Sequence, residues 1–272
     1  MNLTNSSNIN NAYIDNNIDM FYAYLFGYTG TFFSICFSIS PILLFIEANK
    51  HKNLSKIPIL MLLFNILNSA LWLNYGYIKN QYPIIVSNLL NFFINNIWII
   101  WYININYNNQ NIIIRNMLSF CTLGIYLASY ILAKKYFDKF VYHSYEMNKA
   151  LDEDFSKDNY DKFVLVSDII SILATIINTF SYIAPGQNIY LVYKTGNYNS
   201  IPILSCVIGL LCAICWVCYS FVDKTYVYEK HIDWPCFISN GLGAIILINQ
   251  IAIWFYYRNK FKGNILLKNT LT

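Results

Sequence analysis

The sequence has few charged residues. Asp, Glu, Lys and Arg make up only 12% of its 272 residues, whereas 57% are hydrophobic and 18% aromatic. A soluble globular protein carries roughly 25% charged residues, so this scarcity excludes an ordinary water-soluble domain. The mean hydropathy is only +0.40 because Asn and Tyr are abundant.

Charge is scarcest in seven apolar stretches, each near or above the ~20 residues that cross a bilayer as a helix. They lie at 21–46, 57–78, 82–103, 112–133, 163–193, 201–222 and 232–257. Arg115 and Asn116 interrupt the start of the fourth stretch, which we still count as a span. The composition therefore predicts an all-α integral membrane protein with seven transmembrane helices.

Basic residues are missing from the first 20 positions, which excludes a cleaved signal peptide with a basic start. We expect an Asn-rich extracellular tail at 1–20 and a signal anchor from Phe21. Nine basic residues follow spans 1, 3, 5 and 7, against three on the other side: Lys50, Lys52, Lys56, Arg115, Lys194, Arg258, Lys260, Lys262 and Lys268, against Lys79, Lys224 and Lys230. The positive side faces the cytosol as a rule, so we predict an outside N-terminus and a basic cytosolic tail at 258–272.

The sequence also lacks the marks of an enzyme: no nucleophile–base set, zinc spacing or phosphate loop is present. Cys212, Cys215 and Cys218 lie in an apolar span, where packing explains them better than a metal or redox site. The charged stretch 134–162 is expected to be a solvated extracellular loop, with a surface amphipathic segment around 140–151 as the alternative. We expect no catalytic residue, cofactor or metal.

The two halves of the chain repeat each other at a spacing of 144 residues. The matched pairs are Pro41 and Pro185, Lys50 and Lys194, Pro58 and Pro202, Trp72 and Trp216, and Tyr75 and Tyr219. After Tyr219 the second half has about eight extra residues, and Asn88 then pairs with Asn240. The pattern predicts two parallel three-helix repeats, 21–103 and 163–257, joined by a linker helix at 112–133. Such repeats suit alternating access.

Each class of duplicated residue suggests a role. The prolines Pro41, Pro58, Pro185 and Pro202 would kink their helices and act as hinges, although Pro58 and Pro202 also fit ordinary helix starts. The amides of Asn88 and Asn240 suit a polyhydroxylated neutral ligand, and the faces of Trp72 and Trp216 suit a sugar ring. Acids occur only near span ends, which favours passive transport of a neutral solute over ion coupling.

Several segments resemble the SWEET sugar transporters of the PQ-loop superfamily. They are Ser40-Pro41-Ile-Leu-Leu-Phe45, Trp72-Leu-Asn-Tyr75-Gly76, Asn88 and Asn240-Gly241-Leu-Gly243. The resemblance implies a facilitative, bidirectional sugar transporter whose central pocket contains Asn88, Asn240, Trp72 and Trp216.

The resemblance also implies roles for further residues. Four positions would set the size of the substrate: Phe37, Asn68, Ser181 and Cys212. The bulk of Phe37 favours a monosaccharide. An outer gate would comprise Tyr75, Tyr219 and a charged pair of Lys79 with Asp233, with Asp223 as a competitor for the acid. Asn91, Ser220 and Ser239 depart from the family pattern, which leaves helix packing and substrate preference open.

Two alternatives remain at this stage. One is a proton-coupled PQ-loop carrier of amino acids or other small solutes, for which Pro-Gln dipeptides and a membrane-embedded acid would be expected. The other is a seven-helix receptor, which has no need of a tandem repeat. We favour transport of a hexose, with glucose as the expected substrate. The plasma membrane is the expected location, with an intracellular membrane as the alternative. The expected partners are a small neutral sugar and the lipid bilayer, with no nucleic acid; whether copies of the chain associate is left open.

Overall fold

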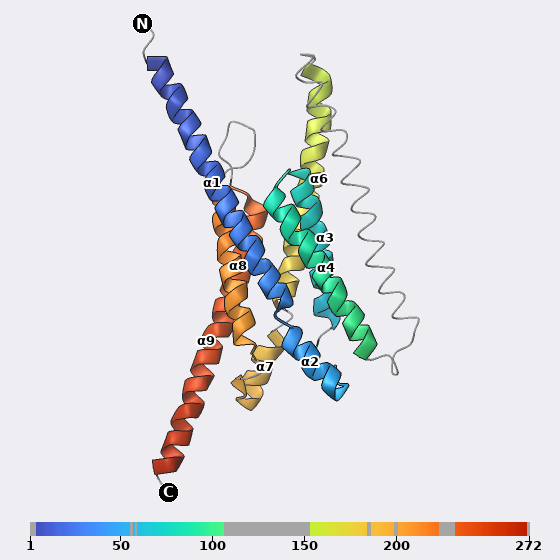
Figure 1. Cartoon of the computed structure of the whole chain (residues 1–272), viewed down its shortest axis with the longest axis vertical. Helices are drawn as coiled ribbons and strands as arrows, with labels where there is room; N and C mark the ends of the chain where they lie inside the picture. Colours follow the sequence, from blue (N-terminus) through green and yellow to red (C-terminus); the bar gives the residue numbers. More distant parts are fainter. Residues whose placement is uncertain are drawn as a thin grey trace.

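The computed structural model describes residues 4–54, 57, 59–105, 153–183, 186–198, 201–222 and 232–270, and within these ranges it contains helices and no strand (Figure 1). The expected linker helix 112–133 lies outside the described residues. The helices are α1 (Thr4–Ile39), α2 (Ile42–His51), α3 (Ile59–Ile78), α4 (Tyr82–Ile105), α6 (Glu153–Ile183), α7 (Gly186–Thr195), α8 (Ile203–Phe221) and α9 (Trp234–Thr270).

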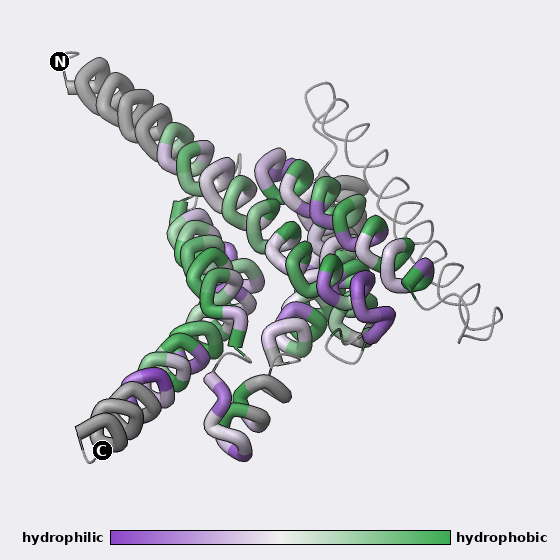
Figure 2. The backbone as a smooth tube through the Cα atoms, turned by 60° about the horizontal axis from the view of Figure 1, so that its bottom comes forward, coloured by the Kyte–Doolittle hydropathy of each residue, from purple (hydrophilic) through white to green (hydrophobic). Residues whose placement is uncertain are grey.

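Within the described residues, four stretches are long and apolar enough to cross a membrane: Met20–His51, Tyr82–Ile105, Ile203–Phe221 and Trp234–Lys260. The 20-residue helix α3 is continuous, but its apolar sequence is interrupted by Asn65, Asn68 and Asn74. Large apolar side chains face outward, for example Leu43 at 70% exposure and Leu204 at 67%. Figure 2 shows a hydrophobic tube along much of α9, with hydrophilic residues gathered just before its grey end. Such a surface is stable against lipid rather than water, which confirms the predicted membrane class.

Six of the described helices form a ring. Helix α1 packs against α4 and α8, α6 packs against α3 and α9, and the pairs α3·α4 and α8·α9 complete the circle. The order around the ring is therefore α1, α4, α3, α6, α9, α8. In each three-helix unit the last helix lies between the first two, and the units meet along two seams, α1·α8 and α3·α6 (Figure 1).

The first span is broken into two helices at Pro41. Pro41, at the N-cap of α2, has a φ of −68° and no N–H to donate, so the ladder of α1 ends at Ile39. Ser40 instead donates its hydroxyl to the carbonyl of Phe37 at 2.7 Å. In the second repeat α6 ends at Ile183 and α7 begins at Gly186, and Pro185 itself lies outside the described residues. Helix α2 packs on α4, and α7 packs on α9, so each stays with its own repeat.

The sequence repeat is also a repeat of contacts. Thr31 donates to the Pro83 carbonyl at 3.2 Å, and Thr175, 144 residues later, donates to the Pro235 carbonyl at 3.4 Å. Pro83 and Pro235 are 152 residues apart, which is the spacing of Asn88 and Asn240. The predicted slip of eight residues before the last helix is thus present in the packing.

Candidate functional site

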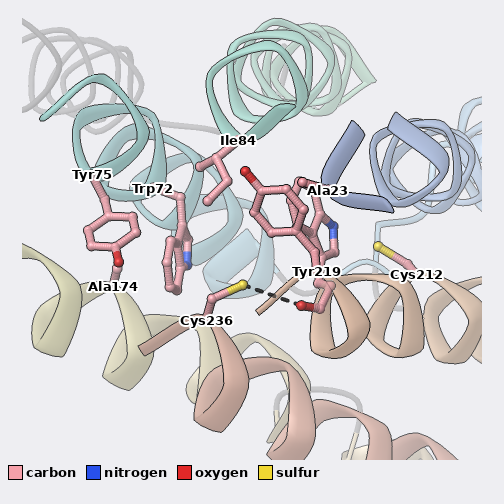
Figure 3. Packing of buried hydrophobic residues seen from close by; sticks show 9 residues of the cluster. Ala23, Trp72, Tyr75, Ile84, Ala174, Cys212, Tyr219 and Cys236 are labelled. Atoms are coloured by element: carbon pink, nitrogen blue, oxygen red, sulfur yellow. Dashed lines mark hydrogen bonds between the residues drawn. The ribbon is translucent and has the colours of Figure 1, made fainter. Parts of the chain in front are cut away.

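Four aromatic side chains meet at the end of the ring where α3 and α8 terminate, which we call the aromatic end. Trp72 contacts Tyr75 edge to face at 5.3 Å and 85°, and Trp216 contacts Tyr219 at 5.3 Å and 83°. All four are buried. Figure 3 shows Trp72 and Tyr219 reaching from α3 and α8 into the space between Ile84 of α4 and Cys236 of α9. The two halves of the cluster are therefore built alike and meet in the centre.

Hydrogen bonds between the repeats close this end. The Tyr75 hydroxyl donates to Asp233 Oδ1 at 2.9 Å, and Gln81 Nε2 donates to Asp233 Oδ2 at 3.4 Å. On the other side the Tyr219 hydroxyl donates to Gln81 Oε1 at 3.5 Å. We call these four residues the cross-repeat latch. Each tyrosine reaches the opposite repeat, so the latch cannot stay intact if the repeats separate at this end.

Asp233 has a second role as the N-cap of α9. Its Oδ1 accepts the backbone N–H of Cys236 at 3.2 Å, which satisfies one of the free donors at the helix start. The sequence predicted a charged pair of Asp233 with Lys79. Among the described contacts Asp233 instead bonds to Tyr75 and Gln81, while Lys79 is half-buried near the end of α3. The alternative acid, Asp223, lies outside the described residues.

Asn88 and Asn240 lie one helical turn beyond Ile84 and Cys236, on the side away from the aromatic end. Each amide donates one N–H to the carbonyl four residues earlier, at 2.9 Å in both cases. Both side chains remain half-buried. The two amides thus occupy equivalent places beneath the aromatic cluster, with part of their donor and acceptor capacity left for another partner.

The four predicted size-setting residues have different surroundings. Asn68 Nδ2 donates to Asn178 Oδ1 at 3.1 Å across the α3·α6 seam, and its own Oδ1 is buried without a hydrogen-bond partner. Phe37 packs against Gly209 across the α1·α8 seam, where Cys212 Sγ lies 3.7 Å from the Gly30 carbonyl. Ser181 donates within its own helix, to Ile177 at 3.1 Å. Three of the four therefore lie at the seams between the repeats.

The predicted hinge prolines are only partly described. Pro41 stands at the break between α1 and α2, as the hinge prediction requires. Pro202 is the N-cap of α8, one residue before the N1 position that proline prefers at a helix start. Pro58 and Pro185 lie outside the described residues.

One departure from the repeat now has a structural explanation. Asn91 donates to Ser34 at 2.6 Å and accepts from Ser38 at 2.8 Å, which ties α4 to α1. The equivalent of Asn91 in the second repeat is Gly243, and a Cβ there would overlap the ring of Tyr182, the equivalent of Ser38. In the first repeat the larger residue of this contact, Asn91, is on the last helix and the smaller, Ser38, is on the first. In the second repeat the larger residue, Tyr182, is on the first helix and the smaller, Gly243, is on the last. Asn91 therefore serves packing within a repeat.

Two site residues were missed by sequence reasoning. Gln81 differs in identity from its counterpart Asp233, and only the spacing of 152 residues relates them. Asn178 was one of many asparagines, and its importance depends on the packing of α6 against α3, which the spacing of the repeats does not reveal.

A ring of two three-helix units, with duplicated amides one turn below the aromatic cluster and a latch at one end, is typical of a repeat-built membrane transporter. A sequence model described as "Sugar efflux transporter for intercellular exchange" matches residues 24–110 and 168–262. The chain belongs to this family, which includes the SWEET transporters. The resemblance seen in the sequence is thereby confirmed.

Individual relatives agree with this assignment. The bidirectional sugar transporter SWEET8 of Arabidopsis thaliana is 23% identical over 241 residues, which cover 86% of this chain and 87% of that protein. SWEET7b of Oryza sativa subsp. japonica is 30% identical over 91 residues, 33% of this chain and 31% of that protein. A solved eukaryotic SWEET transporter shares the fold, with a TM-score of 0.66 at 15% identity over 89% of this chain and 99% of that one.

Proposed function

We propose that this protein carries a hexose, with glucose as the reference substrate, across the membrane in both directions by alternating access between its two repeats. The observation that carries the proposal is the cross-repeat latch, which closes one end of a ring whose interior holds two equivalent amides. The names of the relatives, bidirectional sugar transporters, support the substrate class.

The amides supply the recognition. With one N–H bonded within its helix, Asn88 retains a second N–H and a carbonyl oxygen. Asn240 Nδ2 also lies 3.3 Å from Ser239 Oγ and 3.6 Å from Cys236 Sγ, so its carbonyl oxygen is the group left for a ligand. A sugar hydroxyl both donates and accepts, so one hydroxyl can meet both groups of an amide. Trp72 and Trp216 present apolar faces beside these amides, and the C–H face of a pyranose fits such a surface.

The motion follows from where the repeats are joined. Opening the aromatic end requires Tyr75 to leave Asp233 and Tyr219 to leave Gln81, because each pair spans both repeats. The short helices α2 and α7 follow the ends of α1 and α6. These junctions give each repeat a bend point far from the aromatic end. Following the distribution of basic loop residues, we place the aromatic end outside the cell and the protein in the plasma membrane.

The described helices favour transport without ion coupling. Asp233 begins α9 at the latch, Asp168 is exposed, and Glu47 lies on the exposed side of α2. None of these three lies at the depth of Asn88 and Asn240. A carrier coupled to protons or sodium usually has an acid at that depth.

The test is uptake of radiolabelled glucose by cells that lack their own hexose carriers. We expect saturable uptake and efflux that a proton uncoupler does not reduce. Replacing Asn88 or Asn240 by Ala should lower the rate at least about tenfold, since the substrate loses a buried hydrogen-bond partner.

Matched controls are available on the same helices. Asn96→Ala on α4 and Asn249→Ala on α9 remove amides that make the same bond to the carbonyl four residues earlier, at 2.7 and 2.9 Å. We expect both controls to transport normally. Absence of uptake by correctly inserted protein, or uptake abolished by the uncoupler, would contradict the proposal and favour a proton-coupled carrier.

A further inference from the structure

We infer that Gln81 is the first-repeat counterpart of Asp233, and that this amide–carboxylate pair lets the aromatic end close at neutral pH without a shared proton. Its relevance to transport rests on the proposed function. Closure of the aromatic end is measured by a separate experiment that does not require transport. The inference assigns a positioning role to Gln81, a residue that recognises no substrate.

The spacing of the chain establishes the correspondence. In the last helix of each repeat the matched residues are 152 positions apart, as for Pro83 and Pro235 and for Asn88 and Asn240. The same spacing relates Gln81 to Asp233. One position of the latch therefore carries an amide and its equivalent carries a carboxylate.

The contacts obey the same symmetry. Tyr75 of the first repeat donates to Asp233 of the second, and Tyr219 of the second donates to Gln81 of the first. Gln81 Nε2 then donates to Asp233 Oδ2 at 3.4 Å and joins the two halves. Only 8% of Gln81 is exposed, so its amide bonds within the latch rather than to bulk water.

An amide suits this place because it has both a donor and an acceptor. Gln81 accepts from Tyr219 with its oxygen and donates to Asp233 with its nitrogen at the same time. An ionised carboxylate at position 81 could accept from Tyr219 but not donate to Asp233. The two carboxylates would then repel each other, and the latch would close only when one of them held a proton.

Among the described residues, no other group near the pair takes the place of that shared proton. The titratable groups that interact with the tyrosines of the latch, besides Asp233, are Tyr24 and Tyr28 of α1 and Cys236 of α9, and Lys79 lies in the turn after α3, two residues before Gln81. Asp168 of α6 is exposed, and none of the described hydrogen bonds of Asp233 or Gln81 involves Lys79. The pH dependence of an altered latch would therefore come from positions 81 and 233.

The thiol of Cys236 reports on closure without any need for transport. It is buried directly below the latch, where its Sγ lies 3.6 Å from the Trp216 carbonyl. The experiment measures labelling by a membrane-impermeant thiol reagent added from the aromatic side, between pH 5.5 and 7.5. Subtracting the labelling of the Cys236→Ser variant in each background isolates this residue.

We expect slow labelling at every pH in the unaltered protein. Gln81→Glu should label at least about fivefold faster at pH 7.5 and return toward the unaltered rate at pH 5.5, when a protonated carboxyl replaces the amide. Gln81→Leu should label faster at both pH values, because it can neither donate nor accept.

A double variant tests whether Gln81 and Asp233 act as a pair. Gln81→Glu with Asp233→Asn exchanges amide and carboxylate and keeps a good N-cap for α9. We expect it to restore slow labelling at pH 7.5. The inference is wrong if Gln81→Glu labels like the unaltered protein at pH 7.5, or if its rate relative to the unaltered protein at the same pH is as high at pH 5.5 as at pH 7.5; the ratio is used because the reactive thiolate itself becomes scarcer at low pH. Failure of sugar uptake with these labelling results intact would overturn the proposed function alone.

Discussion

The two seams between the repeats are related by the internal symmetry but are held together differently. On the α3·α6 seam Asn68 bonds to Asn178 at 3.1 Å. The equivalent residues on the α1·α8 seam are Cys212 and Ser34, where a weakly polar thiol bonds to the Ser34 side chain and lies 3.7 Å from the Gly30 carbonyl. An amide pair is a much stronger hydrogen-bonding unit than a thiol. The first seam is therefore held by polar contact.

The α1·α8 seam compensates by close packing. Gly27 and Gly30 on α1 occupy the places of Ser171 and Ala174 on α6. A Cβ at Gly27 would lie 2.8 Å from the ring of Tyr219, and one at Gly30 would lie 3.1 Å from Trp216. Small residues let helices approach closely in a membrane, where van der Waals contact replaces the hydrophobic effect. One seam thus depends on shape and the other on a hydrogen bond, so they should respond to different substitutions.

The largest effect is expected from adding volume to the shape-dependent seam. In Gly27→Ala the new methyl group would overlap Tyr219 across the seam, at 2.8 Å, and also Pro83 of α4 within the same repeat, at 2.7 Å. Neither ring can move without displacing a helix, so we expect a loss of about 2–3 kcal/mol in stability. Thermal unfolding of the purified protein measures it.

Gly241→Ala is the matched control for this change. A Cβ at Gly241 would meet nothing within 4 Å, so stability should be unchanged or slightly higher. Equal losses in the two variants would show that glycine is needed for helix flexibility rather than for packing at the seam.

A smaller effect is expected from removing the polar contact on the other seam. Asn178→Leu deprives the Asn68 amide of its acceptor, and Asn68 Oδ1 is already without a partner. We expect a loss of about 1–2 kcal/mol, because a buried amide is left unpaired. Cys212→Ala, at the position equivalent to Asn68, should cost less than about 1 kcal/mol.

Thermal unfolding of the two variants, together with the double variant Asn68→Ala/Asn178→Ala, tests this difference between the seams. The double variant should recover part of the loss, since neither amide is then stranded. A greater loss from Cys212→Ala than from Asn178→Leu would reverse the assignment of the polar seam.

These differences mark the limit of what the sequence predicted. The spacing of 144 residues predicted the repeat, the Trp and Tyr pairs and the break at Pro41, because each depends on local helix geometry and on residue types that recur. It did not predict the partner of Asp233 or the bond between Asn68 and Asn178. Those contacts depend on which helices become neighbours in the ring. Helices α3 and α6 pack together although they belong to different repeats and lie far apart in the sequence. Identical residues at matched positions reveal the symmetry of the repeats. Equivalent residues of different type, such as Gln81 and Asp233, are not found by comparing the two repeats for identical residues.

The smallest predicted effect extends the comparison to the latch, where the two halves also differ. Tyr75 donates to a carboxylate at 2.9 Å, whereas Tyr219 donates to an amide at 3.5 Å. Hydrogen bonds to charged acceptors are shorter and roughly twice as strong as neutral ones, so Tyr75→Phe should weaken closure about two- to fivefold more than Tyr219→Phe. Labelling of Cys236 in each variant measures closure, and the two phenylalanines keep the ring contacts to Trp72 and Trp216. If both variants label equally, the carboxylate confers no advantage on its half of the latch, and the asymmetry between the repeats would be confined to the seams.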